Sequence, residues 1–159
     1  MEYCIIIRGP AGVGKTTIAK ELAKTLNANY FSFDEIMEEN KLDTIVGDGI
    51  PSENFVKANE IILDLIRNKK RVVLDGCFYR KEQIDHLLNN LKTKVHIFTL
   101  DADIPECSER NKTRMNPLAD EDIKQVHKLV SKIKIGIIII TAGKSIKQIV
   151  SDILNQINR

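Results

Sequence analysis

Residues 9–16 read Gly-Pro-Ala-Gly-Val-Gly-Lys-Thr, and this octapeptide constrains the chain more than any other segment. It follows the apolar run 3–7, Tyr-Cys-Ile-Ile-Ile, which is typical of a buried strand. A glycine-rich loop between a strand and a helix brings backbone amides close to bound phosphates, because glycines carry no side chains that block the approach. The pattern therefore predicts a binding site for a nucleoside triphosphate.

The residues of this loop have separable expected roles. The amides of residues 12–16 point at the phosphates, and the helix that begins inside the loop adds the partial positive charge of its N-terminus. Lys15 is expected to reach the terminal phosphates and to act in catalysis, and the Thr16 hydroxyl is expected to bind Mg²⁺. The residues predicted to bind the nucleotide in this segment are Gly9, Gly12, Val13, Gly14, Lys15, Thr16 and Thr17.

Length and composition indicate one globular domain. A chain of 159 residues matches the usual domain size, so we expect a single domain over residues 1–159. Its net charge of +2 indicates no polyanionic partner. No apolar stretch approaches the roughly 20 residues of a membrane span, and the start lacks a leader sequence, so we expect a cytoplasmic protein without a membrane segment. The three cysteines and three histidines lack the spacing of metal ligands.

Apolar runs alternate with amphipathic stretches, as in successive strand–helix–strand units. The continuous β-branched runs 5–7, 72–74 and 137–140 are typical of central strands, so we expect an α/β fold with a parallel sheet buried on both faces. The strands are expected over residues 3–8, 29–33, 71–75, 94–100 and 134–141. The helices are expected within residues 15–27, 34–42, 52–69, 80–92, 103–114, 120–132 and 144–158.

Two polar segments interrupt this alternation. Residues 43–51 contain two glycines and a proline, and residues 110–120 contain Pro117. Irregular loops inside a compact α/β domain are commonly binding loops or lids. We therefore expect these two segments to be the mobile elements.

Two aspartates end predicted strands. The carboxyl end of a strand in an open α/β sheet faces the ligand crevice, so Asp75 is predicted to order the Mg²⁺ held by Thr16. Its alternative role is a turn or helix cap before Gly76. Asp34 could bind the acceptor and take the proton of its attacking hydroxyl, which would make it catalytic, or it could cap a helix.

Arg110 and Arg114 stand four residues apart in a predicted helix, hence on one face. Guanidinium groups at this spacing suit a lid that neutralises charge on a transferring phosphoryl group, so both are predicted to be catalytic and Arg110 also to bind the nucleotide. A solvated basic face is the alternative. Arg80 could contact the substrate or cap a neighbouring helix. Arg8 is expected to be structural.

Two further segments share only part of a nucleotide-binding motif. Residues 111–114 begin like the guanine-reading N-K-x-D, but Arg114 replaces the carboxylate that would bind the base. Residues 143–145 read Gly-Lys-Ser, but Ile138 occupies the position of the first glycine. We expect the second segment to be the turn into the last helix.

In combination, these motifs resemble the P-loop small-molecule kinases, a group that spans adenylate, shikimate, gluconate, polynucleotide and chloramphenicol kinases. The resemblance is carried by the loop 9–16, the two aspartates and the lid arginines, in that order. It implies a three-layer sandwich with sheet order 2-3-1-4-5, an acceptor-binding segment near residues 34–69 and a short helical lid near residues 108–122. It also implies ATP and Mg²⁺ as cofactors, transfer of the γ-phosphoryl group, and a turn at Gly143 that lies against the adenine.

Departures from the family patterns narrow the range of possible phosphoryl acceptors. Adenylate kinases share the Asp75-Gly76 pair but carry arginines that hold a monophosphate, and shikimate kinases carry acceptor-site arginines and a triple glycine at this point. Here no arginine occurs between Arg8 and Arg67, and Cys77 follows Gly76. Residues 34–53 are strongly acidic, which makes a nucleic-acid acceptor unfavourable.

The sequence therefore favours an ATP- and Mg²⁺-dependent phosphotransferase whose partner is an uncharged or weakly charged small molecule with a hydroxyl group. An adenylate-type kinase of nucleoside monophosphates is the second enzyme hypothesis. A nucleotide-gated binding module or slow ATPase is the alternative from another class. The oligomeric state stays open.

Overall fold

The computed structural model describes residues 1–158 and contains a parallel sheet of order β2-β3-β1-β4-β5, which confirms the expected fold class and strand order. The strands are β1 (Tyr3–Arg8), β2 (Asn29–Ser32), β3 (Arg71–Gly76), β4 (Lys94–Asp101) and β5 (Ile137–Ile140). The helices are α1 (Lys15–Leu26), α2 (Phe33–Glu39), α3 (Ser52–Ile66), α4 (Lys81–Asn90), α5 (Ile104–Asn111), α6 (Asp120–Ser131) and α7 (Ile146–Ile157). None of these helices, all within residues 1–158, combines the length and apolar character that crossing a membrane requires.

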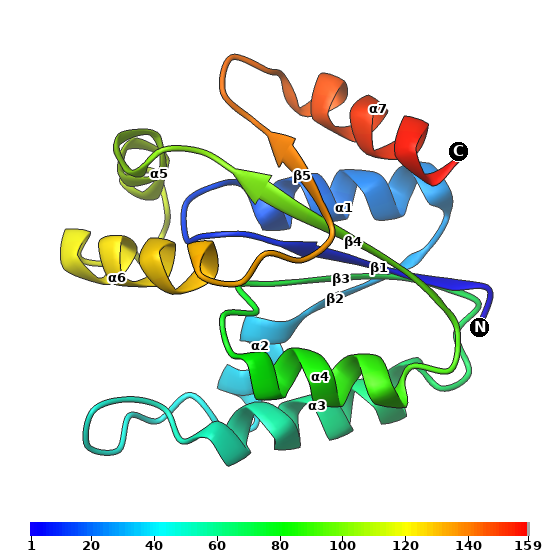
Figure 1. Ribbon diagram of the computed structural model, residues 1–159, viewed down its shortest axis with the longest axis horizontal. Coiled ribbons are helices and arrows are strands. Elements are labelled where there is room, and N and C mark those ends of the chain that lie inside the picture. The colour runs from blue at the N-terminus through cyan, green and yellow to red at the C-terminus, as the bar shows by residue number, and fades with distance from the viewer. Residues whose placement is uncertain (159) are drawn as a thin grey trace.

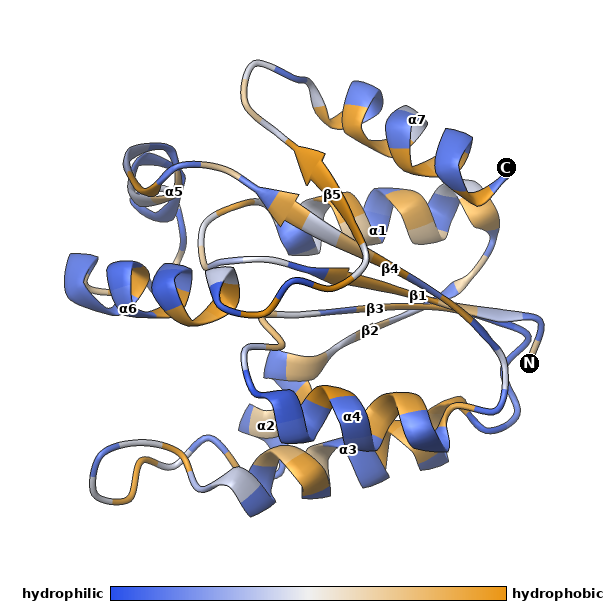
Figure 2. Ribbon diagram, in the orientation of Figure 1, coloured by the Kyte–Doolittle hydropathy of each residue, from blue (hydrophilic) through white to orange (hydrophobic). Residues whose placement is uncertain are grey.

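Two apolar layers hold helices against the sheet. Ile5 and Ile7 of β1 belong to the layer under α1 and α7, and Cys4 and Ile6 belong to the layer under α2, α3 and α4 (Figure 1). Alternate residues of a strand point to opposite faces, so one strand supplies both layers. The apolar side of the covering helices faces the sheet (Figure 2). Helices α5 and α6 lie beyond the carboxyl ends of the strands, where an α/β sheet binds its ligands.

The last strand differs from the expected central strand over residues 134–141. Gly136 turns the chain with a φ of 73°, and a Cβ atom there would lie 2.3 Å from the carbonyl oxygen of Ile97, so β5 begins only at Ile137. β5 forms the edge of the sheet, and Ile138 and Ile140 are more than half exposed. The prediction of a central strand is therefore wrong, because a run of isoleucines favours a strand without specifying its neighbours.

Helix α5 ends at Asn111 rather than at residue 114. The buried side-chain amide of Asn111 donates to the carbonyl of Leu118 at 2.9 Å and accepts from the amide of Leu118 at 3.1 Å. This pair of hydrogen bonds closes the segment between α5 and α6 into a loop. Asn111 thus has a structural role, and its likeness to a base-reading motif has no counterpart in the fold.

Candidate active site

The loop between β1 and α1 presents unpaired backbone amides. Gly12 and Gly14 have left-handed φ angles of 83° and 98°, which glycine adopts without strain. Gly14 is the N-cap of α1, and no side chain caps this helix. Within the described part of the chain, the amides of residues 14–17 donate to no acceptor. Free donors at a helix N-terminus form a binding site for an anion such as a phosphate.

Gly12 allows α5 to lie directly on this loop. A Cβ atom at Gly12 would come within 2.3 Å of the carbonyl oxygen of Cys107, which lies in the middle of α5. The close approach is possible only because the loop has no side chain at this point. The predicted lid helix and the phosphate loop are therefore in direct contact.

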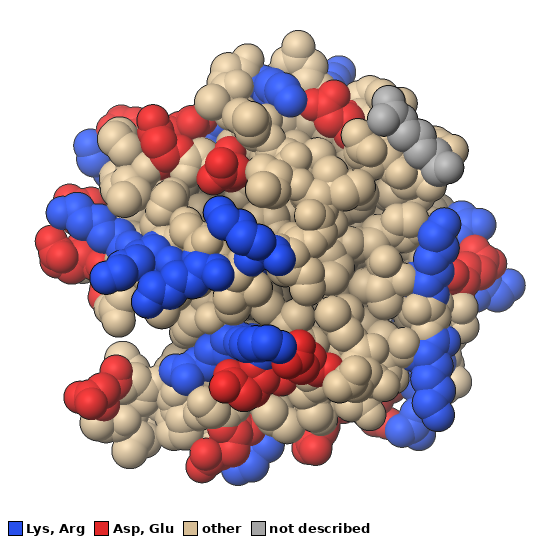
Figure 3. All heavy atoms as spheres, in the orientation of Figure 1, with Lys and Arg blue, Asp and Glu red and all other residues tan. Residues whose placement is uncertain are grey.

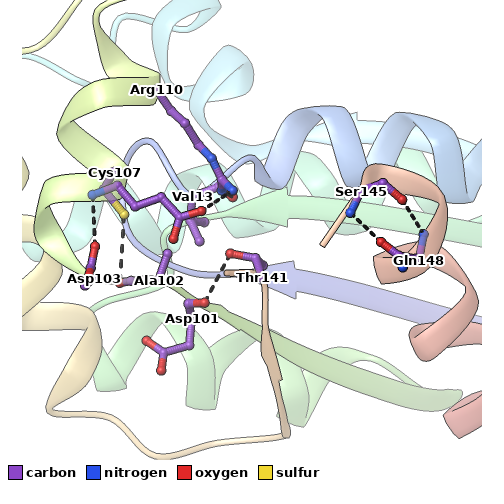
Figure 4. A network of polar contacts seen from close by, with 10 residues as sticks. Val13, Asp101, Ala102, Asp103, Cys107, Arg110, Thr141, Ser145 and Gln148 are labelled. Atoms are coloured by element: carbon purple, nitrogen blue, oxygen red, sulfur yellow. Dashed lines mark hydrogen bonds and ion pairs between the residues drawn. The ribbon is translucent and has the colours of Figure 1, made fainter. Parts of the chain in front are cut away.

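Arg110 ties α5 to the loop through its guanidinium group. Its Nη1 donates to the carbonyl oxygen of Val13 at 2.8 Å, a contact seen in Figure 4, and its Nη2 pairs with Glu106 one turn earlier on α5. The structure thus brings Arg110 to the rim of the phosphate loop. This position suits a cation that contacts phosphoryl oxygens.

Arg114 lies elsewhere. Because α5 ends at Asn111, Arg114 follows in exposed turns, and the prediction that Arg110 and Arg114 share one helix face is wrong. Lysine and arginine side chains gather over α6, next in the chain (Figure 3). Lys124 and Lys128 are among the exposed residues of that helix. The exposed setting of Arg114 fits the alternative of a solvated basic surface.

Lys15 is buried between the loop and the end of β3. Its side chain is among the buried polar groups, at 8% exposure, and its Nζ donates to the carbonyl oxygen of Pro10 at 2.8 Å. Burial raises the pKa of the Cys77 thiol, and the neighbouring Lys15 ammonium opposes this rise. The ammonium group therefore lies between the phosphate loop and the segment that follows β3.

Asp75 lies inside β3 at 1% exposure and is held from two sides. Tyr30 Oη donates to its Oδ2 at 3.1 Å, and the Thr16 hydroxyl lies near the same carboxyl group. Burial raises the pKa of Asp75, whereas the Thr16 hydroxyl and the Lys15 charge oppose the rise. Ionisation of Asp75 is therefore unfavourable at this buried position, and a nearby cation would stabilise the charged form.

The Thr16–Asp75 pair fits a hard cation such as Mg²⁺. No cluster of three histidine, cysteine, aspartate or glutamate side chains that could hold a metal forms within residues 1–158. A cation at this pair would complete its coordination with phosphate oxygens, which is how Mg²⁺ binds in kinases and ATPases. Binding of Mg²⁺ by Thr16 and Asp75 therefore stays a prediction.

Sequence reasoning missed Tyr30. Its hydroxyl reaches Asp75 because β2 pairs with β3, with Tyr30 opposite Val73 and Ser32 opposite Asp75. A tyrosine in a strand is commonly a packing residue, so the sequence offered no signal beyond its closeness to Asp34. The neighbouring position of the two strands is needed to find the contact.

The local setting of Asp34 differs from both expectations. β2 ends at Ser32, so Asp34 lies in the first turn of α2 and does not end a strand. The cap of α2 is Ser32, whose hydroxyl accepts from the amide of Glu35 at 3.4 Å. Asp34 is exposed, and its charge lies close enough to raise the pKa values of Asp75 and Cys77. Its charge therefore lies near Asp75 and Cys77.

Arg80 fastens the start of α3. Its Nη1 donates to Ser52 Oγ at 3.0 Å and its Nη2 to the carbonyl oxygen of Ile50 at 2.9 Å. Its guanidinium also lies 4.7 Å from the ring centroid of Phe55, within cation–π range. Of the two roles considered for Arg80, the structure shows the contact with a neighbouring helix.

Gly143 lies in the turn between β5 and α7, with a φ of 69°. The amide and hydroxyl of Thr141 bond to the carbonyl oxygen of Asp101 at 3.0 and 3.2 Å, and Ser145 and Gln148 cap each other's backbone amides (Figure 4). These residues confirm the predicted turn into the last helix. The turn is attached to the carboxyl end of β4, from which α5 also departs.

Comparison with other proteins identifies the family. Residues 4–132 match the AAA domain family. The chain is similar to the shikimate kinase of Actinobacillus succinogenes, with 32% identity over 127 residues that cover 77% of this chain and 72% of that protein. A 40-residue segment is 50% identical to a putative adenylate kinase of Saccharolobus solfataricus, covering 25% of this chain and 21% of that protein.

A solved structure shares the fold. The gluconokinase from Sinorhizobium meliloti 1021 superposes with a TM-score of 0.79 over 98% of this chain and 91% of that one, at 14% identity. At this identity the likeness concerns the fold alone. The family match, in contrast, spans most of the chain and includes the phosphate loop, Asp34, Asp75 and Arg110. The chain therefore belongs to the AAA domain family, and it is one of the P-loop small-molecule kinases that its motifs resemble.

Proposed function

We propose that this kinase transfers the γ-phosphoryl group of ATP to a hydroxyl group of an uncharged or weakly charged small molecule. The observation that carries the proposal is that free loop amides, the Lys15 ammonium and the buried Asp75 carboxylate lie near one another at the carboxyl ends of β1 and β3. Thr16 and Asp75 would hold Mg²⁺, which when bound offsets phosphate charge. The free cysteines fit a reducing compartment such as the cytoplasm.

The nucleotide would be held by several parts of the crevice. The loop residues from Gly9 to Thr17 surround the phosphates, with Lys15 at the terminal ones, and the turn at Gly143 receives the adenine. Arg110 stabilises charge on the transferring group from the α5 side, within a lid of residues 108–122.

Asp34 is the candidate base on the acceptor side. Its exposed carboxylate faces the crevice from α2 and is free to accept the proton of the attacking hydroxyl. Such a group also holds the hydroxyl in line with the phosphoryl group. We assign residues 34–69 to acceptor binding, with Arg80 shaping this segment through Ser52 and Phe55.

The class of acceptor follows from the charges on this side. Shikimate kinase and gluconokinase are named for acceptors that carry a carboxylate as well as hydroxyl groups, and this chain differs on the acceptor side. Here residues 9–66 contain no arginine, and both Nη atoms of Arg80 already have acceptors within the chain. A phosphate or carboxylate on the acceptor would therefore find no obvious guanidinium partner, which favours an acceptor without a strong negative charge.

A phosphotransfer screen tests the proposal. Purified protein with ATP and Mg²⁺ is offered nucleosides, sugars, polyols and nucleoside monophosphates, and product is detected directly. Transfer to an uncharged hydroxyl compound is expected. Transfer to a nucleoside monophosphate alone would establish an adenylate-type kinase instead, and ATP turnover that no acceptor raises would establish the binding module or slow ATPase.

Two variants separate the aspartates in the active assay. Asp34→Asn is expected to lower transfer by about 100-fold with ATP affinity retained, because the base is lost. Asp75→Asn is expected to raise the Mg²⁺ requirement. Glu38→Gln, one turn further along α2 and exposed, is the matched control. If Asp34→Asn changes only metal affinity, Asp34 is a metal ligand and not the base.

A further inference from the structure

Arg8 is a buried arginine without a carboxylate partner. It is the last residue of β1, directly before the phosphate loop, and it is 1% exposed. Within residues 1–158 its guanidinium forms no ion pair. In the part of the chain that the structure describes, all its hydrogen-bond acceptors are neutral oxygens, and its Nε has no acceptor. The charge is therefore held by dipoles alone.

These acceptors belong to segments that are distant in the sequence. Nη2 donates to the carbonyl oxygens of Phe78 at 3.2 Å and Val130 at 3.1 Å. Nη1 donates to the carbonyl oxygen of Ile133 at 3.0 Å and to Thr99 Oγ1 at 3.1 Å. Arg8 thus joins the end of β1 to the segment after β3, to β4 and to the end of α6.

Two of these segments frame the active site. Phe78 has a left-handed φ of 46°, an uncommon conformation for a residue with a side chain, and it lies between Cys77 and Tyr79 on the acceptor side. Val130 lies in the last turn of α6, the helix that follows the lid loop, and Ile133 comes directly after its C-cap, Lys132. The last carbonyls of a helix carry partial negative charge, which suits a cation. A single guanidinium therefore fixes the acceptor turn and the base of the lid.

Packing alone does not account for an arginine here. Burying an unpaired charge is strongly unfavourable unless its hydrogen bonds compensate, and an apolar side chain of similar volume would fill the same space. What an apolar side chain could not do is bond Phe78, Val130 and Ile133 at once. The planar, multidentate geometry of the guanidinium suits this role.

We propose that Arg8 is a positioning residue for phosphoryl transfer, holding the turn at Phe78 and the carboxyl end of α6 in fixed relation to the phosphate loop. The proposal rests on the proposed function. Arg8 does not reach the reacting atoms, and it acts through the backbone segments that carry them. The lid loop between α5 and α6 would then close against a hinge that does not move.

Arg8→Met and Arg8→Lys test the role, with Arg71→Met as the matched control. Arg71 also bonds the last carbonyl of a helix, Leu26 of α1, but at the opposite end of the sheet. Arg8→Met is expected to lower kcat by about 10- to 100-fold, as misplacement of catalytic groups does, with the KM for ATP changed by less than about threefold. Arg8→Lys should recover part of kcat, and Arg71→Met should keep it.

Hydrogen exchange gives a readout that needs no substrate. In Arg8→Met the amides of residues 77–80 and 130–135 are expected to exchange faster, and in Arg71→Met they are not. If Arg8→Met does not fold, Thr99→Val is the second test variant. It removes a hydroxyl that accepts a hydrogen bond from Arg8 and donates one to the carbonyl oxygen of Ile135. The same changes, smaller in size, are expected.

The outcomes separate the two proposals. Wild-type protein that transfers no phosphoryl group to any acceptor defeats the proposed function. Wild-type protein that transfers normally, together with an Arg8→Met or Thr99→Val variant that keeps full kcat and unchanged exchange, overturns the positioning role alone. An equal loss of kcat in Arg71→Met would also overturn it, since the effect would then be one of general stability.

Discussion

The phosphate side and the acceptor side of the crevice are built differently. On the phosphate side Arg8, Lys15 and Asp75 are buried, and each is hydrogen-bonded within the protein. On the other side, the loop 43–50 is held by a short bridge between Val46 and Gly49 and by the Arg80 hydrogen bond to the carbonyl oxygen of Ile50, and Ile45 is 71% exposed. In the loop between α5 and α6, the predicted lid, Met115 is 96% exposed.

This contrast assigns different tasks to the two sides. Segments with few buried contacts open at low free-energy cost, and binding loops and lids are drawn from such segments. We expect the phosphate loop to be preformed, because α5 packs directly against it at Gly12. We expect the acceptor segment and the lid to adjust when both substrates bind, while the phosphate loop stays in place.

The largest expected effect comes from removing the positive charge of Lys15 on the phosphate side. Lys15→Ala should lower ATP turnover by at least about 100-fold, because the terminal phosphates lose their ammonium partner. Circular dichroism checks that the variant folds, and steady-state kinetics measure the loss of ATP turnover. Lys24→Ala, exposed on the same helix, is the control and should keep its activity. A folded Lys15→Ala variant with normal ATP affinity and turnover would remove the assignment of the nucleotide site.

A glycine pair compares the two sides directly. Gly12→Ala combines left-handed strain with a 2.3 Å approach to a carbonyl oxygen, so it should cost more than about 2 kcal/mol of unfolding free energy and weaken nucleotide binding. Gly47→Ala has strain but open space around it, so it should cost only about 1 kcal/mol and leave nucleotide affinity unchanged. Denaturant unfolding and nucleotide titration measure both. Equal costs would mean that the loop is not preformed.

The two arginines sharpen the comparison within the lid. Arg110→Ala should lower kcat by roughly 100-fold and raise the KM for ATP far less, because its charge acts mainly in the transition state. Arg114→Ala, exposed and beyond the end of α5, should change kcat by less than about threefold. Steady-state kinetics of both variants decide the matter. A larger loss in Arg114→Ala would place the catalytic cation on the lid loop.

The smallest expected effect concerns stability and pH. Burial raises the folded-state pKa of Asp75, so the folded protein holds this proton more tightly than the unfolded chain does. Stability is then lost as pH rises from about 4 through the raised pKa, and Asn at this position avoids the loss. Without nucleotide, Asp75→Asn should therefore be at least as stable as wild type at neutral pH. Thermal unfolding across pH checks this, and a large drop for Asp75→Asn would refute it.

Local sequence patterns predicted the elements better than their ends or neighbours. The apolar run before Gly9 predicted β1, and the alternation of runs predicted the parallel sheet. The predicted end of α5 was wrong, because the side chain of Asn111 hydrogen-bonds Leu118, a residue beyond the helix. The isoleucine run of β5 also did not predict that this strand lies at the edge of the sheet. Each error concerns a contact between segments that a local pattern does not record.

The sequence by itself determined the phosphate loop, since its glycines, Lys15 and Thr16 are adjacent and their backbone geometry is local. Only the tertiary structure decided how that loop is completed. It brought Tyr30 to Asp75 across 45 residues and Arg8 to Val130 across 122. Such pairs depend on which strands become neighbours and on where helices cross the sheet. That choice minimises the free energy of the whole core, so no short segment carries it.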